Sequence, residues 1–174
     1  MACNSYTLSG LNNSCKENSF GGIKEVLIAQ YDDVSGVTIA SGTSLATVTM
    51  VSGKKFAQYK LLKNTGSLTS TLNVDTSNSF TNEVTLQFMK METSKRLEIM
   101  ALMMSNCMVI CKDANNHYWL LGKDSYVECS AGSATTSTNA SESNHYELTL
   151  QDTSFELPYE VDPATIPSIV QEVA

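Results

Sequence analysis

The chain has few of the residues that catalytic and metal sites use. Its 174 residues include two histidines, His117 and His145, and they contain no Cys-x-x-Cys pair, no Gly-x-Ser-x-Gly turn and no Walker or dinucleotide fingerprint. Each histidine precedes a tyrosine in an expected strand, without further ligands at metal-binding spacing. The sequence therefore predicts no catalytic residue, no cofactor-binding residue, no metal ligand and no cofactor, and we expect a protein that is not an enzyme.

Positive charge is also scarce. Lysine and arginine number 11 against 18 aspartate and glutamate residues, which gives a net charge of −7 and a pI near 4.7. The basic residues form no cluster, so tight binding to a phosphate backbone is not expected. The sequence has no apolar run of membrane-spanning length and begins without a basic or apolar stretch, so we expect neither a membrane segment nor a signal peptide.

The five cysteines do not suggest a disulfide framework. Their number is odd, and Cys107 and Cys111 lie four residues apart in an expected strand. An extended chain separates two such residues by about 13 Å, too far for a disulfide. We therefore expect buried free thiols in a protein made in a reducing cytoplasm.

What the chain does contain is alternation with a period of two. In residues 67–74, Leu68, Leu72 and Val74 alternate with polar residues, and residues 81–89 repeat the pattern. Such alternation is typical of half-buried antiparallel strands. The sequence therefore predicts a mainly β protein, an antiparallel β-sandwich or small barrel with one flanking α-helix at residues 93–106. Residues 64–66 carry a hairpin signal, Asn-Thr-Gly.

Helical spacing appears once. Leu97, Met100, Ala101 and Met104 recur every three to four residues and are expected to face the sheet. Three further apolar residues widen the apolar surface beyond one stripe. The resulting hypothesis is that a neighbouring subunit covers Ile99, Leu102 and Met103.

The polar segments divide the chain. Residues 1–22 are expected to form an N-terminal arm, residues 23–157 a β-sandwich domain and residues 158–174 a C-terminal arm. Residues 130–143 contain mostly Ser, Ala, Thr, Gly and Asn and are expected to form an exposed flexible loop. A single core does not need these segments, so we expect them to contact neighbouring subunits.

A resemblance rests on two stretches, residues 15–34 and 95–150. The second runs from a helix with the sequence KRLEIMALMMSN through CMVICKDANNHYWLLG and a Ser/Thr-rich loop to the strand YELTL. This order resembles structural proteins of tailed bacteriophages, including those of the crAss-like group. Asn116 stands in the turn where these proteins have glycine, and asparagine tolerates the left-handed backbone.

The resemblance implies a tail-tube-like fold and a virion protein made in the bacterial host cytoplasm. Its partners would be further copies of itself in a homo-oligomeric ring or tube, together with other tail or head–tail connector proteins. DNA would pass through an acidic lumen without specific binding, because like charges repel. Two alternatives stay open: a capsid decoration or head–tail joining protein, and, from another class, a ligand-binding β-sandwich module.

Overall fold

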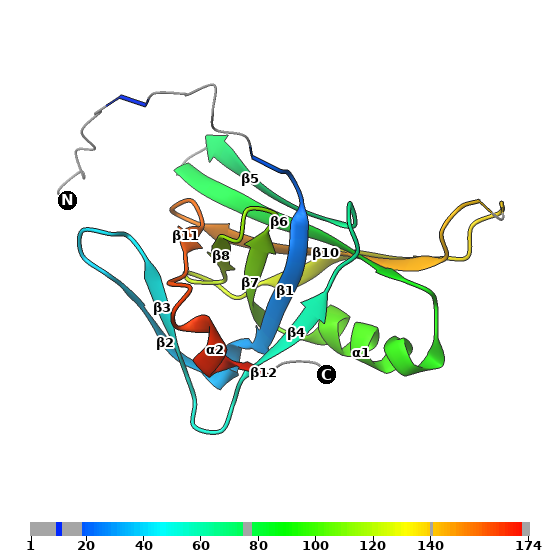
Figure 1. Cartoon of the computed structure of the whole chain (residues 1–174), viewed down its shortest axis with the longest axis horizontal. Helices are drawn as coiled ribbons and strands as arrows, with labels where there is room; N and C mark the ends of the chain where they lie inside the picture. The colour runs from blue at the N-terminus through cyan, green and yellow to red at the C-terminus, as the bar shows by residue number, and fades with distance from the viewer. Residues whose placement is uncertain (1–9, 12–18, 75–77, 140, 172–174) are drawn as a thin grey trace.

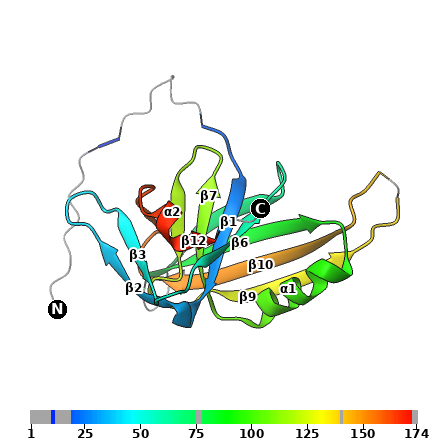
Figure 2. The same ribbon diagram turned by 60° about the horizontal axis from the view of Figure 1, so that its bottom comes forward.

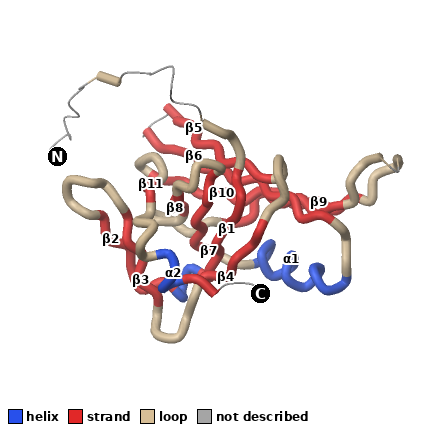
Figure 3. The backbone as a smooth tube through the Cα atoms, in the orientation of Figure 1, coloured by secondary structure: helices blue, strands red, loops and turns tan. Residues whose placement is uncertain are grey.

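Strands dominate the structure. The computed structural model describes residues 10–11, 19–74, 78–139 and 141–171. Figures 1 and 3 show many strands, one substantial helix and short helical turns. In chain order the elements are β1 Ile23–Gln30, the 3-10 turn η1 Tyr31–Asp33, β2 Val34–Ile39, β3 Ala46–Met50, β4 Phe56–Lys60, β5 Gly66–Val74, β6 Asn78–Met89, α1 Thr93–Met104, β7 Cys107–Asp113, β8 Tyr118–Leu121, β9 Glu128–Thr135, β10 His145–Ser154, β11 Tyr159–Glu160, α2 Ile166–Ile169 and β12 Val170–Gln171.

Two sheets pack against each other. One has six strands in the order β11-β8-β7-β1-β4-β12, and the other has four in the order β5-β6-β10-β9. The hairpin β2-β3 forms a separate two-stranded sheet. All pairs between these strands are antiparallel except β12 with β4. The predicted mainly β sandwich with one main helix is confirmed, and the described residues form no closed barrel.

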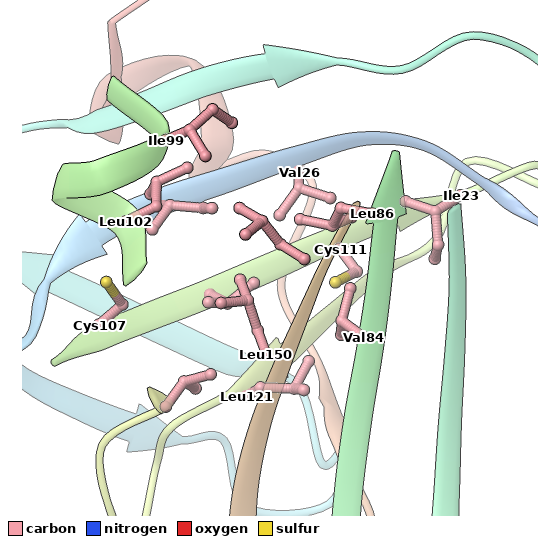
Figure 4. Close-up of a cluster of buried hydrophobic side chains, with 14 of the residues drawn as sticks. Ile23, Val26, Val84, Leu86, Ile99, Leu102, Cys107, Cys111, Leu121 and Leu150 are labelled. Atoms are coloured by element: carbon pink, nitrogen blue, oxygen red, sulfur yellow. The ribbon is translucent and has the colours of Figure 1, made fainter. Parts of the chain in front are cut away.

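Two apolar clusters lie on opposite faces of the six-stranded sheet. The first fills the space between the two large sheets and includes Val26, Leu86 and Leu150 (Figure 4). The second is covered by β2-β3 and α2, and Leu27 and Ile110 belong to it. Strands β1 and β7 are therefore buried on both faces, which explains why their sequences read as continuous apolar runs rather than as alternation.

Helix α1 presents a different face to the core from the one the sequence predicts. Ile99 and Leu102 are each 5% exposed and point between the sheets, as Figure 4 shows. Met103 packs against the same cluster. This subunit's own core buries Ile99 and Leu102 and partly buries Met103, so it takes the place that the hypothesis gives to a neighbouring subunit at the first two residues. The exposed apolar residues are instead Leu97, Met100, Ala101 and Met104.

The described part of the predicted C-terminal arm belongs to the sandwich. β11 extends one edge of the six-stranded sheet by pairing with β8, and β12 extends the other by pairing with β4. Val161, Ile166, Ile169 and Val170 are buried in the second cluster. Residues 158–171 thus close the core of their own subunit. Most of the predicted N-terminal arm, residues 1–9 and 12–18, lies outside the described residues.

The segment expected as a flexible loop begins with a strand. β9 pairs with β10 along residues 128–135, and only residues 136–144 connect the two strands. Small side chains suit this strand because α1 packs on it: a Cβ at Gly132 would lie 2.6 Å from Met103 Cε. Backbone pairing with β10 holds the strand in place without large side chains.

The two asparagine turns have different outcomes. Asn116 has a φ of 70°, so the left-handed turn between β7 and β8 forms without glycine. Asn64 also has a positive φ of 64°. The hairpin predicted at residues 64–66 is nevertheless wrong, because β4 and β5 belong to different sheets. The chain turns there to cross from one layer of the sandwich to the other.

A pair of leucines on α1 tests which face of the helix is buried. Replacing Leu102 with alanine should lower the free energy of unfolding by about 2–5 kcal/mol, because the change leaves a cavity in the core. Leu97 is 72% exposed, so Leu97→Ala should change the free energy by about 0.5 kcal/mol or less. Urea unfolding measures both values, and equal losses would show that the helix is oriented differently.

A second pair tests the C-terminal segment. Ile169→Ala should cost about 2–5 kcal/mol of unfolding free energy, since this side chain is buried against the six-stranded sheet. Ala164→Ser changes an exposed position of the same segment and should be nearly neutral. Denaturant unfolding again gives the measurement. A neutral Ile169→Ala would mean that the segment is an arm, as the sequence predicts.

Candidate functional site

The four-stranded sheet has one face that packs in the core and one that does not. Along β10, buried Tyr146, Leu148 and Leu150 alternate with half-buried Glu147 and Thr149. The buried set contacts the six-stranded sheet, and the other set points away from the molecule. We call this second side the outer sheet face. Figure 2 shows β6, β10 and β9 side by side with α1 next to β9.

The outer sheet face is polar and, in the described strands, carries no lysine or arginine. Its ionisable side chains there are three glutamates, Glu83, Glu128 and Glu147, and one histidine, His145. These strands bury none of the side chains on this face. Strand pairing assigns to it Ser67, Thr69, Thr71, Asn73, Ser79, Thr81, Glu83, Thr85, Gln87, Met89, Glu128, Ala131, Ser133, Thr135, His145, Glu147, Thr149, Gln151 and Thr153.

Hydrogen bonds between strands hold several of these groups. Gln87 Nε2 donates to Glu147 Oε2 at 2.7 Å, and the two residues are direct partners across β6 and β10. Asn73 Nδ2 donates to Thr81 Oγ1 at 2.6 Å across β5 and β6. Such cross-strand pairs stabilise a sheet modestly and fix side-chain direction. The outer sheet face is thus an ordered surface of acceptors and neutral polar groups.

Among the described residues no further strand pairs with either edge strand of the four-stranded sheet, although α1 lies beside β9. β5 has nine residues and no charged one, and β9 has eight with a single charge, at Glu128. Proteins usually protect exposed edges with charge, proline or very short strands. The six-stranded sheet follows that rule at β11, which has two residues, and two residues of its other edge strand, β12, are described. β5 and β9 are longer and carry little charge, so β5, and β9 where α1 leaves its edge free, are the candidates for pairing with another strand.

The free backbone groups of β5 can be identified. Gln87 N–H donates to Thr65 O at 2.8 Å, which makes these two residues a hydrogen-bonded pair. Bonding alternates along an antiparallel ladder, so the next bonded pair is Ser67 with Thr85. The residues between them turn their N–H and C=O groups away from β6. In β5 these are Gly66, Leu68, Ser70, Leu72 and Val74.

A groove of about 680 Å³ lies at one end of the sandwich. Its floor and walls come from the β2-β3 turn, the β5-β6 end of the four-stranded sheet and residues 155–160. Trp119, the only tryptophan of the sequence, lines this groove rather than the main core. Four aromatic residues contribute to the lining: Phe80, Trp119, Phe155 and Tyr159.

The two histidines and the buried cysteines lie in different parts of the fold and do not form a common site. His117 Nδ1 lies 2.6 Å from Glu160 Oε1, and this contact raises the pKa of His117. His145 belongs to the other sheet and lies beside Ser143. Cys107 and Cys111 are buried free thiols, and burial raises the pKa of Cys107 to about 11. The described residues contain no group of three His, Cys, Asp or Glu side chains that could hold a metal ion.

One buried carboxylate connects the two sheets. Asp152 is 4% exposed and accepts hydrogen bonds from Asn82 Nδ2 at 2.7 Å and Gly122 N at 2.6 Å. Burial is the largest influence on this carboxyl and raises its pKa, although both bonds oppose that shift. Asn82 Oδ1, beside it, is buried without a hydrogen-bond partner among the described residues. Nothing in the sequence indicates this cluster, because Asp152 and Asn82 lie in separate strands.

No known protein family, curated protein or solved structure matches this chain. None of its described helices is long and apolar enough to cross a membrane. A functional proposal must therefore be argued from the geometry and charge of the chain itself.

Asp152→Asn tests the cost of burying this carboxylate. The pKa of Asp152 is higher in the folded protein than in the unfolded chain, where it is about 4. At pH values above about 4, the folded protein therefore binds more protons at this carboxyl than the unfolded chain does. The contribution of Asp152 to stability is therefore present below that pH and falls as pH rises through the folded pKa. The amide in the variant is neutral throughout. We expect the stability of the variant, relative to that of the natural protein, to increase as the pH rises above about 4.

Urea unfolding of both proteins at several pH values gives the difference directly, and other titrating groups cancel in it. Asp33→Asn is the control, because that carboxylate pairs with Lys54 at the surface. Parallel stability profiles for the natural protein and Asp152→Asn would show that burial does not raise the pKa of Asp152.

Proposed function

We propose that this chain is a virion structural protein of a tailed bacteriophage that assembles into a homo-oligomeric ring or tube for DNA passage. The observation that carries the proposal is the pair of open edges, β5 and β9, on opposite sides of one four-stranded sheet. Two such edges let each copy join one neighbour on each side. A ring or tube of this kind would be made in the host cytoplasm and would join other tail or connector proteins.

Strand direction favours head-to-tail joining. Neighbours in the order β5-β6-β10-β9 are antiparallel, so β5 and β9 run in opposite directions. When copies are related by rotation about an axis, β9 of one copy meets β5 of the next in antiparallel orientation. Antiparallel pairing thus continues across the junction without reversing a subunit. An interface of this heterologous kind forms a ring when its rotation closes.

The outer sheet face has the charge that a DNA channel requires. A sheet continued from copy to copy would present this face to one side of the assembly, which we assign to the lumen. Its three glutamates repel phosphates, and its described strands place no lysine or arginine there to hold them. DNA could then move through without binding. The chain as a whole is also negatively charged, with a net charge of −7.

The groove supports a second candidate function. An apolar groove of about 680 Å³ with four aromatic residues and a few polar groups has the size and lining of many ligand sites. A ligand-binding β-sandwich module would use it as a monomer, whereas the ring requires association. A capsid decoration or head–tail joining protein would also associate, and electron microscopy of the particle distinguishes it by position.

Ser70 provides the test of the open edge. Its N–H faces away from β6, so Ser70→Pro removes a donor from the edge without removing a bond within the sheet. One backbone hydrogen bond contributes about 1 kcal/mol net, and the proline ring also obstructs the incoming strand. We expect the protein concentration needed for assembly to rise about tenfold or more.

Ser70→Ala is the matched control, because it changes the same side chain and keeps the N–H. Sedimentation and negative-stain electron microscopy should show rings or tubes for the natural protein and for Ser70→Ala, and mainly monomers for Ser70→Pro. Circular dichroism checks that each variant is folded. Assembly of Ser70→Pro at the natural concentration would exclude β5 as an interface, and a natural protein that stays monomeric would contradict the ring.

A further inference from the structure

Helix α1 carries an exposed apolar stripe. Leu97 is 72% exposed, Met100 41% and Met104 79%, and Ala101 lies between them. Their spacing of three and four residues places them on one side of the helix. The opposite side holds Ile99 and Leu102 in the core, so both sides of α1 are apolar. We call these four exposed residues the α1 stripe.

The groove is open and apolar at the other end of the molecule. Phe155 is 71% exposed, Leu157 57% and Leu72 49%, and all three line it. Trp119 of β8 and Tyr159 of β11 line the groove, and Figure 1 shows that α1 lies far along the long axis from these two strands. The stripe of one copy therefore cannot reach the groove of the same copy, but it can reach that of a second copy.

One pair of opposite charges is available between the two surfaces. Among the described residues, the charged side chains that line the groove are Glu156 and Glu160. Lys123 and His117 contact these carboxylates from outside the lining. Beside the stripe, Arg96 is exposed, and no described residue forms an ion pair with it. Arg96 is also the only arginine in the sequence. An arginine can bind a carboxylate through two hydrogen bonds, which favours an acidic groove as its partner.

The two surfaces adjoin the two open edges of the sheet. α1 packs on β9, where Met103 covers Gly132. The groove includes Leu72 of β5 and Phe80 of β6. Pairing of β9 with β5 of the next copy places the two copies side by side, and docking of the stripe in the groove also requires that the next copy be shifted along the long axis, as in a staggered ring or tube. The stripe and the groove thus extend the proposed edge interface with apolar area, which backbone pairing alone does not supply.

We propose that the α1 stripe of one copy docks in the groove of the next copy, with Arg96 directed at Glu156 or Glu160. This inference rests on the proposed ring and names its main apolar contact. It is a helix-in-groove contact with anchors at three- and four-residue spacing. Two methionines in the stripe suit it, because flexible thioether side chains adapt to an irregular groove. The contact is heterologous, as ring formation requires.

The test uses two variants of the full chain. The stripe variant carries Leu97→Glu, Met100→Glu and Met104→Glu, and the groove variant carries Phe155→Glu and Leu157→Glu. All five positions are exposed, so both variants should fold, which circular dichroism and thermal unfolding check. Leu62→Glu is the control, since Leu62 is 62% exposed and lies outside both surfaces.

Each variant alone should stay monomeric. In every contact between two identical copies, either the stripe or the groove carries the glutamate substitutions. An equimolar mixture should form a complex of twice the monomer mass, since the stripe of the groove variant meets the intact groove of the stripe variant. That complex cannot grow further. Sedimentation velocity measures all species, and Leu62→Glu should assemble like the natural protein.

Three results would overturn the inference. If either variant alone assembles like the natural protein, the stripe and groove are not the interface, while the proposed ring stands. A mixture that stays monomeric also excludes the docking, even if the natural protein assembles. If the natural protein is itself monomeric, the docking and the proposed function fail together, and the groove is left to a small ligand.

Discussion

The structure depends on the burial of β1 and β7 on both faces. These two neighbouring strands form the centre of the six-stranded sheet, and their side chains supply both apolar clusters. Each face of the sheet then needs its own cover. The four-stranded sheet and α1 cover one face, and the β2-β3 hairpin and the C-terminal segment cover the other. Hydrophobic burial scales with area, so both covers are required for a stable core.

The two large sheets differ in how much of their surface is buried. The six-stranded sheet is covered on both faces, whereas the four-stranded sheet gives one face to the core and leaves the other to solvent. Long edges with little charge and a face whose described strands lack lysine and arginine belong to the four-stranded sheet, and the helix stripe and the apolar groove border this sheet at its two ends. Their position around one sheet is what favours association through that sheet.

Some errors of sequence interpretation have a common cause. On α1 both sides are apolar, and spacing alone does not say which side meets the sheet. In β9 the small residues that suggest a loop are those that let the helix approach, as at Gly132. In residues 158–171, buried apolar residues are spread among prolines and polar residues, so no period appears. Each case depends on a neighbour distant in sequence.

The sequence by itself determined the strand content, the single substantial helix and the turn at Asn116, because period and local backbone preference are properties of short segments. It also determined the absence of positive clusters along the chain. Only the tertiary structure decided which strands share a sheet, which edges stay open, and that Glu83, Glu128 and Glu147 lie on one face. Those features follow from pairing between distant segments, where side-chain packing across the sandwich selects one partner among many.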